Sequence, residues 1–262
     1  MKTAPKPAAR AETGTLGKAV DVLDIVARAD TPLRFTDILR LADQPRGTLH
    51  RQIANLLEEG LLVLNSDNSY GLGMRLMQLA AKAWSRNDLR LIAAPHLQKL
   101  HEATGETVHL GVLRGVDVVY LDKIESRQSV RMVSQIGNTA PAYCTGVGKA
   151  ALSALPEAEL DALVKQIRFR FYTSQTLMDK MALYRHLKEV RERGVAFDRQ
   201  EHEVGIACVA APIHLSNGAA GISVTGPSYR LTWQVLASYV EVTRKAAAAI
   251  MDDLAAGLAP RS

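Results

Sequence analysis

The segment of residues 36–58 constrains the fold of this 262-residue chain more than any other, because it predicts two short helices joined by a tight turn. Apolar residues recur at helical spacing and are expected to face inward: Ile38, Leu39, Leu41, Leu49, Ile53, Leu56 and Leu57. Asp43 and Gln44 stand where an N-cap of the second helix belongs, and Pro45 suits its first position, where a missing N–H costs nothing. The segment therefore predicts a helix–turn–helix.

Polar side chains remain exposed at the start of the second helix: Arg46, Thr48, His50 and Arg51. This end of a recognition helix reaches base edges and phosphates in the major groove of DNA. Residues 61–73 then predict two short strands around a polar turn, the pattern of a wing. The alternative is an ordinary helical hairpin with solvated arginines. A DNA interface is favoured because the donors gather at one helix start, in front of an apolar seam and before a hairpin.

The net charge of the N-terminal segment gives no support to a DNA interface. Residues 1–73 contain nine Lys or Arg and nine Asp or Glu, so the segment is not basic on balance. The formal charge of +5 on the whole chain arises further along and is no argument for DNA binding.

Length and composition limit the class of protein. A chain of 262 residues suits two modest domains, and 47% hydrophobic with 23% charged residues is typical of a soluble globular protein. No apolar run reaches the ~18–20 residues that span a bilayer, so no membrane association is expected. Residues 1–14 lack the apolar core of a signal peptide and are expected to form a disordered tail. Cys144 and Cys208 follow no pairing pattern and are expected to be buried thiols in a reducing cytoplasm.

Helical periodicity precedes and follows a central block of strands. Helices are expected at residues 16–29, 74–86, 89–103, 147–155, 157–166, 179–193 and 232–254. Strands are expected at residues 106–113, 116–124, 129–134, 206–214 and 219–225. The helix at 74–86 is expected to connect two domains and to be able to pack against a second subunit, with Leu76, Leu79, Ala80 and Ala83 inward. This order predicts an α+β domain, an antiparallel sheet with helices packed on its faces.

The glycine-containing loop at residues 143–149 superficially resembles a phosphate loop. It lacks the full nucleotide pattern, because Tyr143 replaces the first glycine and Ala150 follows Lys149 in place of Ser or Thr. The glycines still free backbone N–H groups at a helix start, which favours a small anion such as a carboxylate. A glycine-loosened helix start that only aids packing is the open alternative.

A second group of polar residues lies at Asp198, Arg199, Glu201, His202, Glu203 and Cys208. Its spacing matches no zinc pattern, and a Cys/His nucleophile would need a base that the sequence does not place at the thiol. We therefore expect Cys208 to line a pocket and Asp198 to be a polar pocket group. Ser223 and Thr225 are two residues apart and therefore share one face of a strand. That face is either exposed to solvent or part of a ligand site, and the sequence leaves both interpretations open. His109, among apolar strand residues, is expected in the core or a pocket wall.

Taken together, these pieces resemble the IclR family of bacterial transcriptional regulators over residues 15–253. The matching stretches are KAVDVLDIVA, PRGTLHRQIANLLEEGLL with its wing, YGLGMRLMQLA, PHLQKLHEATGETVHLGVL, VVYLDKIES, YCTGVGKAAL, RERGVAFDRQEHEVGIACVAAPI and GISVTGPSYRLT. So many ordered matches at natural spacing make the resemblance specific.

The resemblance implies a winged helix–turn–helix followed by a GAF-like α/β effector domain, in dimers or dimers of dimers on operator DNA. The implied parts are a tail (1–14), the DNA-binding domain (15–73), a linker helix (74–87), the effector domain (88–254) and a tail (255–262). The implied effector residues are Met132, Gly146, Val147, Asp198, Cys208, Ser223 and Thr225. The implied ligands are small organic acids, and no metal, cofactor or enzymatic activity is expected.

A carboxylate is expected at the 146–147 amides, with Asp198 accepting from a hydroxyl or hydrated carbonyl at the other end of the ligand. That polarity favours a hydroxy or oxo acid. The chain departs from the family pattern at Gly47, where Ser is usual, at the wing turn, which has no Lys or Arg, and at Thr225, where Ser is common. The alternative function is a small-molecule enzyme with an accessory helical domain, using Cys144, Cys208 and His202. The absence of a complete catalytic or metal pattern favours the regulator.

Overall fold

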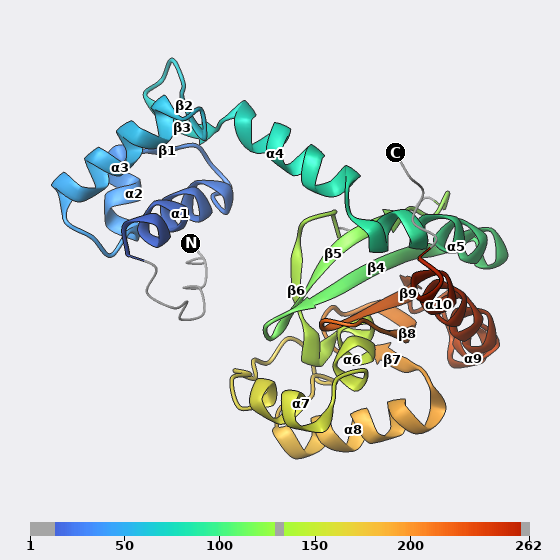
Figure 1. The fold of residues 1–262 in the computed structure, drawn as a ribbon. Helices are drawn as coiled ribbons and strands as arrows, with labels where there is room; N and C mark the ends of the chain where they lie inside the picture. Colours follow the sequence, from blue (N-terminus) through green and yellow to red (C-terminus); the bar gives the residue numbers. More distant parts are fainter. Residues whose placement is uncertain (1–13, 129–133, 258–262) are drawn as a thin grey trace. The chain divides into compact units, whose positions relative to one another are not determined.

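The computed structural model describes residues 14–128 and 134–257 (Figure 1). The chain divides into two compact units, residues 1–86 and residues 87–262. Each unit has its own core and is described by itself. Within the described residues, no helix combines the length and apolar character needed to cross a bilayer.

From residue 14 on, where its description begins, the N-terminal unit contains four helices and a small antiparallel sheet. The helices are α1 (Gly14–Ala27), α2 (Phe35–Leu41), α3 (Arg46–Glu58) and α4 (Met74–Ser85). The strands β1 (Leu33–Arg34), β2 (Leu62–Leu64) and β3 (Ser69–Leu72) pair in the order β1-β3-β2. Helices α2 and α3 with the β2–β3 hairpin confirm the predicted winged helix–turn–helix.

Helix α3 packs on the core of this unit through one apolar face. That core comprises Val22, Val26, Ile38, Leu49, Ile53, Leu56 and Leu62. Two details of the prediction are wrong. Leu41 is 61% exposed, because it is the last residue of α2 and lies outside the core of this unit. Pro45 is the N-cap of α3, in extended conformation, and Arg46 is the first helical residue.

Helix α4 buries none of its residues. The prediction placed Leu76, Leu79, Ala80 and Ala83 inward, yet Leu79 is 53% exposed and both alanines are exposed as well. The prediction that these side chains are buried was therefore wrong, because no residue of α4 belongs to the hydrophobic core of the N-terminal unit. Met74 and Met77 add further exposed apolar surface to the helix.

The C-terminal unit is a six-stranded antiparallel sheet with helices on its faces, which confirms the predicted fold class. The strands are β4 (Thr107–Arg114), β5 (Asp117–Ile124), β6 (Thr139–Pro141), β7 (Ala196–Arg199), β8 (Ile206–His214) and β9 (Ala219–Pro227), in the order β6-β5-β4-β9-β8-β7. The helices are α5 (Asp88–Thr104), α6 (Gly146–Ser153), α7 (Glu157–Val164), α8 (Lys180–Arg193), α9 (Trp233–Ser238) and α10 (Val240–Ala255), with a 3-10 turn η1 (Ala142–Cys144).

The two faces of this sheet differ in chemistry. On one face Val108, Val224 and Val209 lie opposite one another on β4, β9 and β8 and pack against α5 and α10 (Figure 1). The other face packs against α6, where a side chain at Gly221 would meet the carbonyl of Val147 at 2.9 Å. Because successive strand residues alternate between faces, the residues between these valines point toward α6.

Several elements differ from the sequence prediction, which contained neither the short strands β1 and β6 nor strand β7. Strand β7 was not predicted, because four residues after a helix carry too weak a period to be recognised. The closing helix is two helices, α9 and α10, separated at Tyr239. Of the strand predicted at 129–134, residues 129–133 lie outside the described part of the chain.

Candidate functional site

The exposed edge of α3 is assembled as the sequence predicts. Arg46, His50 and Arg51 are exposed and Thr48 is half-buried, while Leu49 on the opposite side is fully buried. No described carboxylate forms an ion pair with Arg46 or Arg51, so both guanidinium groups keep their donors for another partner. The edge therefore presents cationic donors on a rigidly anchored helix.

Phe35 of α2 orients this edge, which the sequence analysis did not anticipate. The Arg46 guanidinium carbon lies 5.3 Å from the centroid of the Phe35 ring, and the His50 ring meets the same ring edge-on at 6.0 Å. A cation held over an aromatic face loses part of its rotamer freedom before it binds anything else. Phe35 therefore positions two of the predicted DNA-contacting side chains.

The wing uses its polar side chains to hold its own turn. Asp67 accepts hydrogen bonds from the backbone N–H and the hydroxyl of Ser69, at 3.0 and 2.6 Å. Asn65 donates to the same hydroxyl at 3.0 Å, and Asn68 adopts a φ of 61° that Asn tolerates better than most residues. The wing tip is therefore well defined but offers no cation.

In the C-terminal unit, strand register brings distant residues of the sequence into one buried row. Asp198 on β7 lies opposite Cys208 on β8, and Cys208 lies opposite Thr225 on β9. Ser223, two residues before Thr225, lies opposite His109 on β4. Directly opposed residues share a face, so all five side chains point toward α6.

These five side chains are buried, with Ser223 only 1% exposed. The Ser223 and Thr225 hydroxyl oxygens lie 3.2 Å apart, and the Ser223 hydroxyl lies 3.5 Å from Nδ1 of His109. The solvated sheet face, one of the two open interpretations of Ser223 and Thr225, is therefore wrong. The sheet face toward α6 therefore buries a row of hydroxyls, a thiol and a carboxyl, which are groups able to form hydrogen bonds.

The glycines at 146 and 148 bring the start of α6 against this row. A Cβ at Gly146 would lie 2.2 Å from the Cys208 sulfur, and a Cβ at Gly148 would lie 2.4 Å from the Cα of Ala142. Glycine is thus required for close packing at both positions. The N-cap residue Thr145 makes no side-chain cap, because its hydroxyl donates to the Pro141 carbonyl at 3.0 Å. The N–H groups of the first turn therefore have no capping side chain.

Lys149 has a structural role that its position in the loop does not reveal. Its fully buried ammonium donates to both Glu201 carboxylate oxygens at 2.5 Å and to the Phe197 carbonyl at 2.7 Å. This buried pair joins α6 to the segment after β7. Removing one partner of such a pair leaves an uncompensated buried charge, which is strongly destabilising.

Burial controls the protonation of Asp198, next to this pair. Desolvation raises the pKa of Asp198 to about 7, although the nearby Lys149 opposes the rise. One Asp198 oxygen accepts the backbone N–H of Glu201 at 2.8 Å, which orients the carboxyl. Near neutral pH the group therefore exchanges between an acid that donates and a carboxylate that only accepts.

Two further side chains on this face escaped the sequence analysis, because nothing in their local pattern marks them. Tyr120 on β5 stacks on His109 with ring centroids 5.0 Å apart, and burial together with Cys208 and Asp198 raises the pKa of Tyr120. Ser134 lies 2.7 Å from Nε2 of His109. Burial and Lys123 lower the pKa of His109 to about 3, so its imidazole is neutral. The side chains of His109 and Tyr120 are therefore both uncharged at neutral pH.

The two thiols are poor nucleophiles in this setting. Burial raises the pKa of Cys208 to about 12 and raises that of Cys144 as well. A catalytic cysteine needs the opposite shift, which argues against the alternative of a cysteine enzyme. Among the described residues, no group of three or more His, Cys, Asp or Glu side chains is placed to hold a metal ion. Met132 lies outside the described residues.

A winged helix–turn–helix with an uncompensated basic edge, in one chain with a domain that buries a polar row, defines a DNA-binding regulator with a ligand-binding domain. The family models for the IclR helix-turn-helix domain and for the bacterial transcriptional regulator IclR C-terminal domain match residues 15–66 and 81–252. The chain belongs to the IclR family of bacterial transcriptional regulators, which confirms the resemblance inferred from the motifs. Its relatives are regulators and not enzymes.

Named relatives support the same assignment along nearly the whole chain. The HTH-type transcriptional regulator XynR of Escherichia coli is 34% identical over 236 residues, 89% of this chain and 94% of that protein. The crystal structure of the Thermotoga maritima IclR protein matches with a TM-score of 0.70 and 33% identity, covering 92% and 98% of the two chains. The crystal structure of an IclR homologue from Microbacterium hydrocarbonoxydans, complexed with 4-hydroxybenzoate, matches with a TM-score of 0.76 and 26% identity. The match covers 93% of this chain and 100% of that chain.

Proposed function

We propose that this regulator controls a catabolic operon in the cytoplasm, binding operator DNA through Arg46, Thr48, His50 and Arg51 and responding to a small hydroxy or oxo acid. The observation that carries the effector proposal is the buried row formed by Asp198, Cys208 and Thr225 beneath the uncapped start of α6. The proposed effector residues among those described are Gly146, Val147, Asp198, Cys208, Ser223 and Thr225.

The chemistry of this face supports an acid with a second polar group. The first-turn N–H groups of α6 favour a carboxylate, since they lie at the positive end of a helix. The hydroxyls of Ser223 and Thr225 supply donors from the sheet. Asp198 complements a hydroxyl or hydrated carbonyl at the far end of the ligand. The Microbacterium homologue was solved with 4-hydroxybenzoate, a hydroxy acid of this kind.

A thermal-shift screen on the full chain tests this proposal. A hydroxy acid (4-hydroxybenzoate) and an oxo acid (pyruvate) are compared with hexanoate, which has a carboxylate but no second polar group. A ligand at a hundred times its Kd stabilises the folded state by about 2.7 kcal/mol, which should raise Tm by several degrees. Equal stabilisation by hexanoate, or none by either polar acid, would contradict the proposed ligand class.

The protonation of Asp198 predicts that acid binding weakens as pH rises. Below its pKa of about 7 Asp198 is neutral, and its carbonyl oxygen can still accept from the ligand hydroxyl. Above that pKa the ionised group adds a second negative charge to a buried site that already holds the ligand carboxylate, and this repulsion outweighs the better acceptor. Affinity for 4-hydroxybenzoate is therefore expected to fall between about pH 6 and pH 8, and Asp198→Asn should flatten that dependence. Calorimetric titrations across this range measure it. A wild-type profile as flat as that of the variant would remove Asp198 from the ligand's surroundings.

Asp198 also predicts a pH dependence of stability without ligand. Its folded-state pKa is raised above the unfolded value, so its contribution to stability is full below about pH 4 and is lost as pH rises through about 7. Denaturant titrations of wild type and Asp198→Asn should therefore show a difference in unfolding free energy that changes over this window.

Exposed apolar residues on α4 support the further proposal that the chain forms a homodimer or a dimer of dimers. A reader of two half-sites needs a two-fold partner, and Met77 and Leu79 leave apolar surface that no described residue covers. Replacing both with Lys is expected to shift the protein from dimer to monomer in light scattering. Gln78→Lys adds a charge to an exposed polar position of the same helix and serves as the control. A monomeric wild type at micromolar concentration, with and without DNA, would disprove the proposal.

A further inference from the structure

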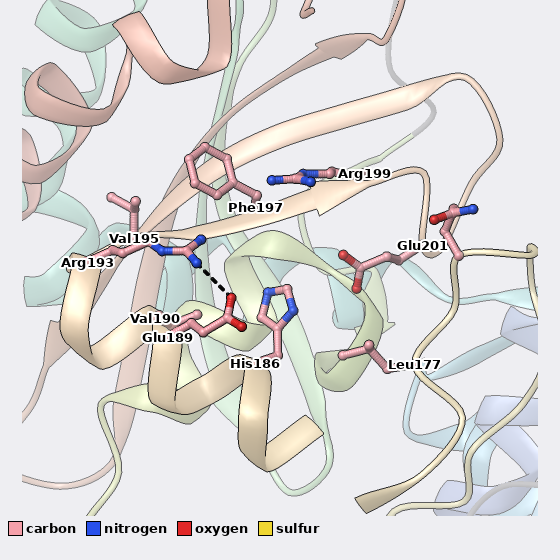
Figure 2. A pocket seen from close by; sticks show the side chains of 10 residues that line it. Leu177, His186, Glu189, Val190, Arg193, Val195, Phe197, Arg199 and Glu201 are labelled. Carbon is pink, nitrogen blue, oxygen red and sulfur yellow. Dashed lines mark hydrogen bonds and ion pairs between the residues drawn. The ribbon is translucent and has the colours of Figure 1, made fainter. Parts of the chain in front are cut away.

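A cavity in the C-terminal unit lies outside the buried polar row. Its volume is about 190 Å³, and it opens between α8 and β7, the terminal strand in the described order of the sheet (Figure 2). None of its lining residues belongs to the proposed effector set. Leu177, Val190 and Phe197 provide an apolar wall, and Figure 2 shows Arg199 across the cavity from His186.

Arg199 is the distinctive group of this cavity. Its guanidinium carbon lies 4.0 Å from the centroid of the Trp233 ring and 5.8 Å from that of Phe197. Two aromatic rings thus hold the charge in place without using its N–H donors. Within residues 14–128 and 134–257, no carboxylate pairs with it.

The other charged groups at the cavity are already compensated. Arg193 pairs with Glu189 at 2.9 Å, and Glu201 accepts both of its short bonds from Lys149. The pKa of His186 is lowered to about 3 by burial and by the cations Lys149, Arg193 and Arg199. His186 is therefore neutral, which leaves Arg199 as the charged lining residue without a described ion-pair partner.

We propose that this cavity is a second small-molecule site, which takes a monocarboxylate with a small apolar body. The carboxylate lies on the Arg199 guanidinium, whose planar pair of N–H donors matches two carboxylate oxygens. The body lies against Phe197, Val190 and Leu177. The volume is below the ~300–1,000 Å³ of sites for drug-sized ligands, which suits an acid of benzoate size. This site goes beyond the proposed function and does not depend on it.

Crystals of the full chain soaked with 4-bromobenzoate test the location directly, because bromine gives an anomalous signal. A bromine peak is expected between α8 and β7 in the wild type. The same peak is expected in Thr225→Val, which changes only the proposed effector row, and its loss is expected in Arg199→Gln. A cavity without bromine in the wild type would overturn the inference, whatever is found at the effector row.

Trp233 provides a solution measurement, since it contacts Arg199. In a Trp84→Phe background it is the remaining tryptophan, and benzoate is expected to change its fluorescence saturably when indole is excited at its red edge. Adding Arg199→Gln should weaken binding at least about tenfold, because a charge-assisted hydrogen bond is lost. Arg185→Gln, an exposed arginine of α8 outside the cavity, removes the same charge and should leave the Kd unchanged. Equal Kd values for wild type and Arg199→Gln would overturn the proposal.

Discussion

Replacing Arg46 and Arg51 together with Ala is expected to abolish operator binding at physiological salt. Both side chains are exposed at the start of α3, and neither is engaged by a described carboxylate. An arginine that contacts a phosphate contributes about one to the slope of log affinity against log salt. An arginine that reads a guanine contributes roughly 1–3 kcal/mol of discrimination. The double variant should therefore lose at least about a hundredfold in affinity.

Fluorescence anisotropy with labelled operator at several salt concentrations separates the two roles. Loss of a phosphate contact weakens binding to all sequences and lowers the salt slope, whereas loss of a base contact relaxes the preference at one base pair. Lys99→Ala removes one exposed cation from α5 in the other unit and is the charge control. If both single arginine variants and the double variant bind operator like wild type, α3 is not the recognition helix.

Phe35 offers a subtler test of the same surface. Because the Phe35 ring contacts both Arg46 and His50, Phe35→Leu keeps an apolar side chain in α2 but removes the aromatic face. A loss of DNA affinity in this variant with little change in stability would assign the ring a positioning role.

Replacing Gly146 with Ala is expected to cause the second large effect, the loss of both packing and acid binding. The added Cβ would lie 2.2 Å from the Cys208 sulfur, a distance that forces the Cys208 side chain, α6 or β8 to move. Overpacking of this kind costs about 1–3 kcal/mol. The new methyl group also occupies the space between the first-turn amides and the polar row, where the ligand carboxylate is proposed to lie.

A matched double variant separates stability from binding. Cys208→Ala removes the sulfur, after which the nearest remaining contacts of a Cβ at position 146 are ordinary ones at 3.5 Å, to Asp198. Gly146→Ala with Cys208→Ala should therefore recover stability relative to Gly146→Ala and show a coupling energy within about 0.5–3 kcal/mol. Calorimetry should still detect no acid binding, while operator binding persists. Ordinary acid binding in the stable double variant would mean that the glycine loop serves packing and that the effector lies elsewhere.

The sequence predicted best where function depends on local periodicity. Leu49, Ile53 and Leu56 repeat at helical spacing, so the buried side of α3 and therefore its exposed edge follow from a single segment. The glycines of the 143–149 loop likewise indicated a helix start, which the structure places at Gly146. Predictions that required a neighbouring element were less secure: Leu41 and Leu79 satisfy the apolar pattern, yet no described residue covers them.

Only the tertiary structure shows which residues these local features contact and how deeply they are buried. Lys149 appears in the sequence as part of an anion loop, but the fold pairs it with Glu201, 52 residues away. Asp198, Cys208 and Thr225 become one row only through the register of three strands. Tyr120 joins His109 on the same face by strand pairing, and no local signal marked Tyr120 in the sequence. The sequence by itself determined most of the helices, the family and the exposed edge of α3, since these depend on patterns within single segments. Shared faces and burial depend on pairing between distant segments, and these set the charge state of Asp198 and the partner of Lys149.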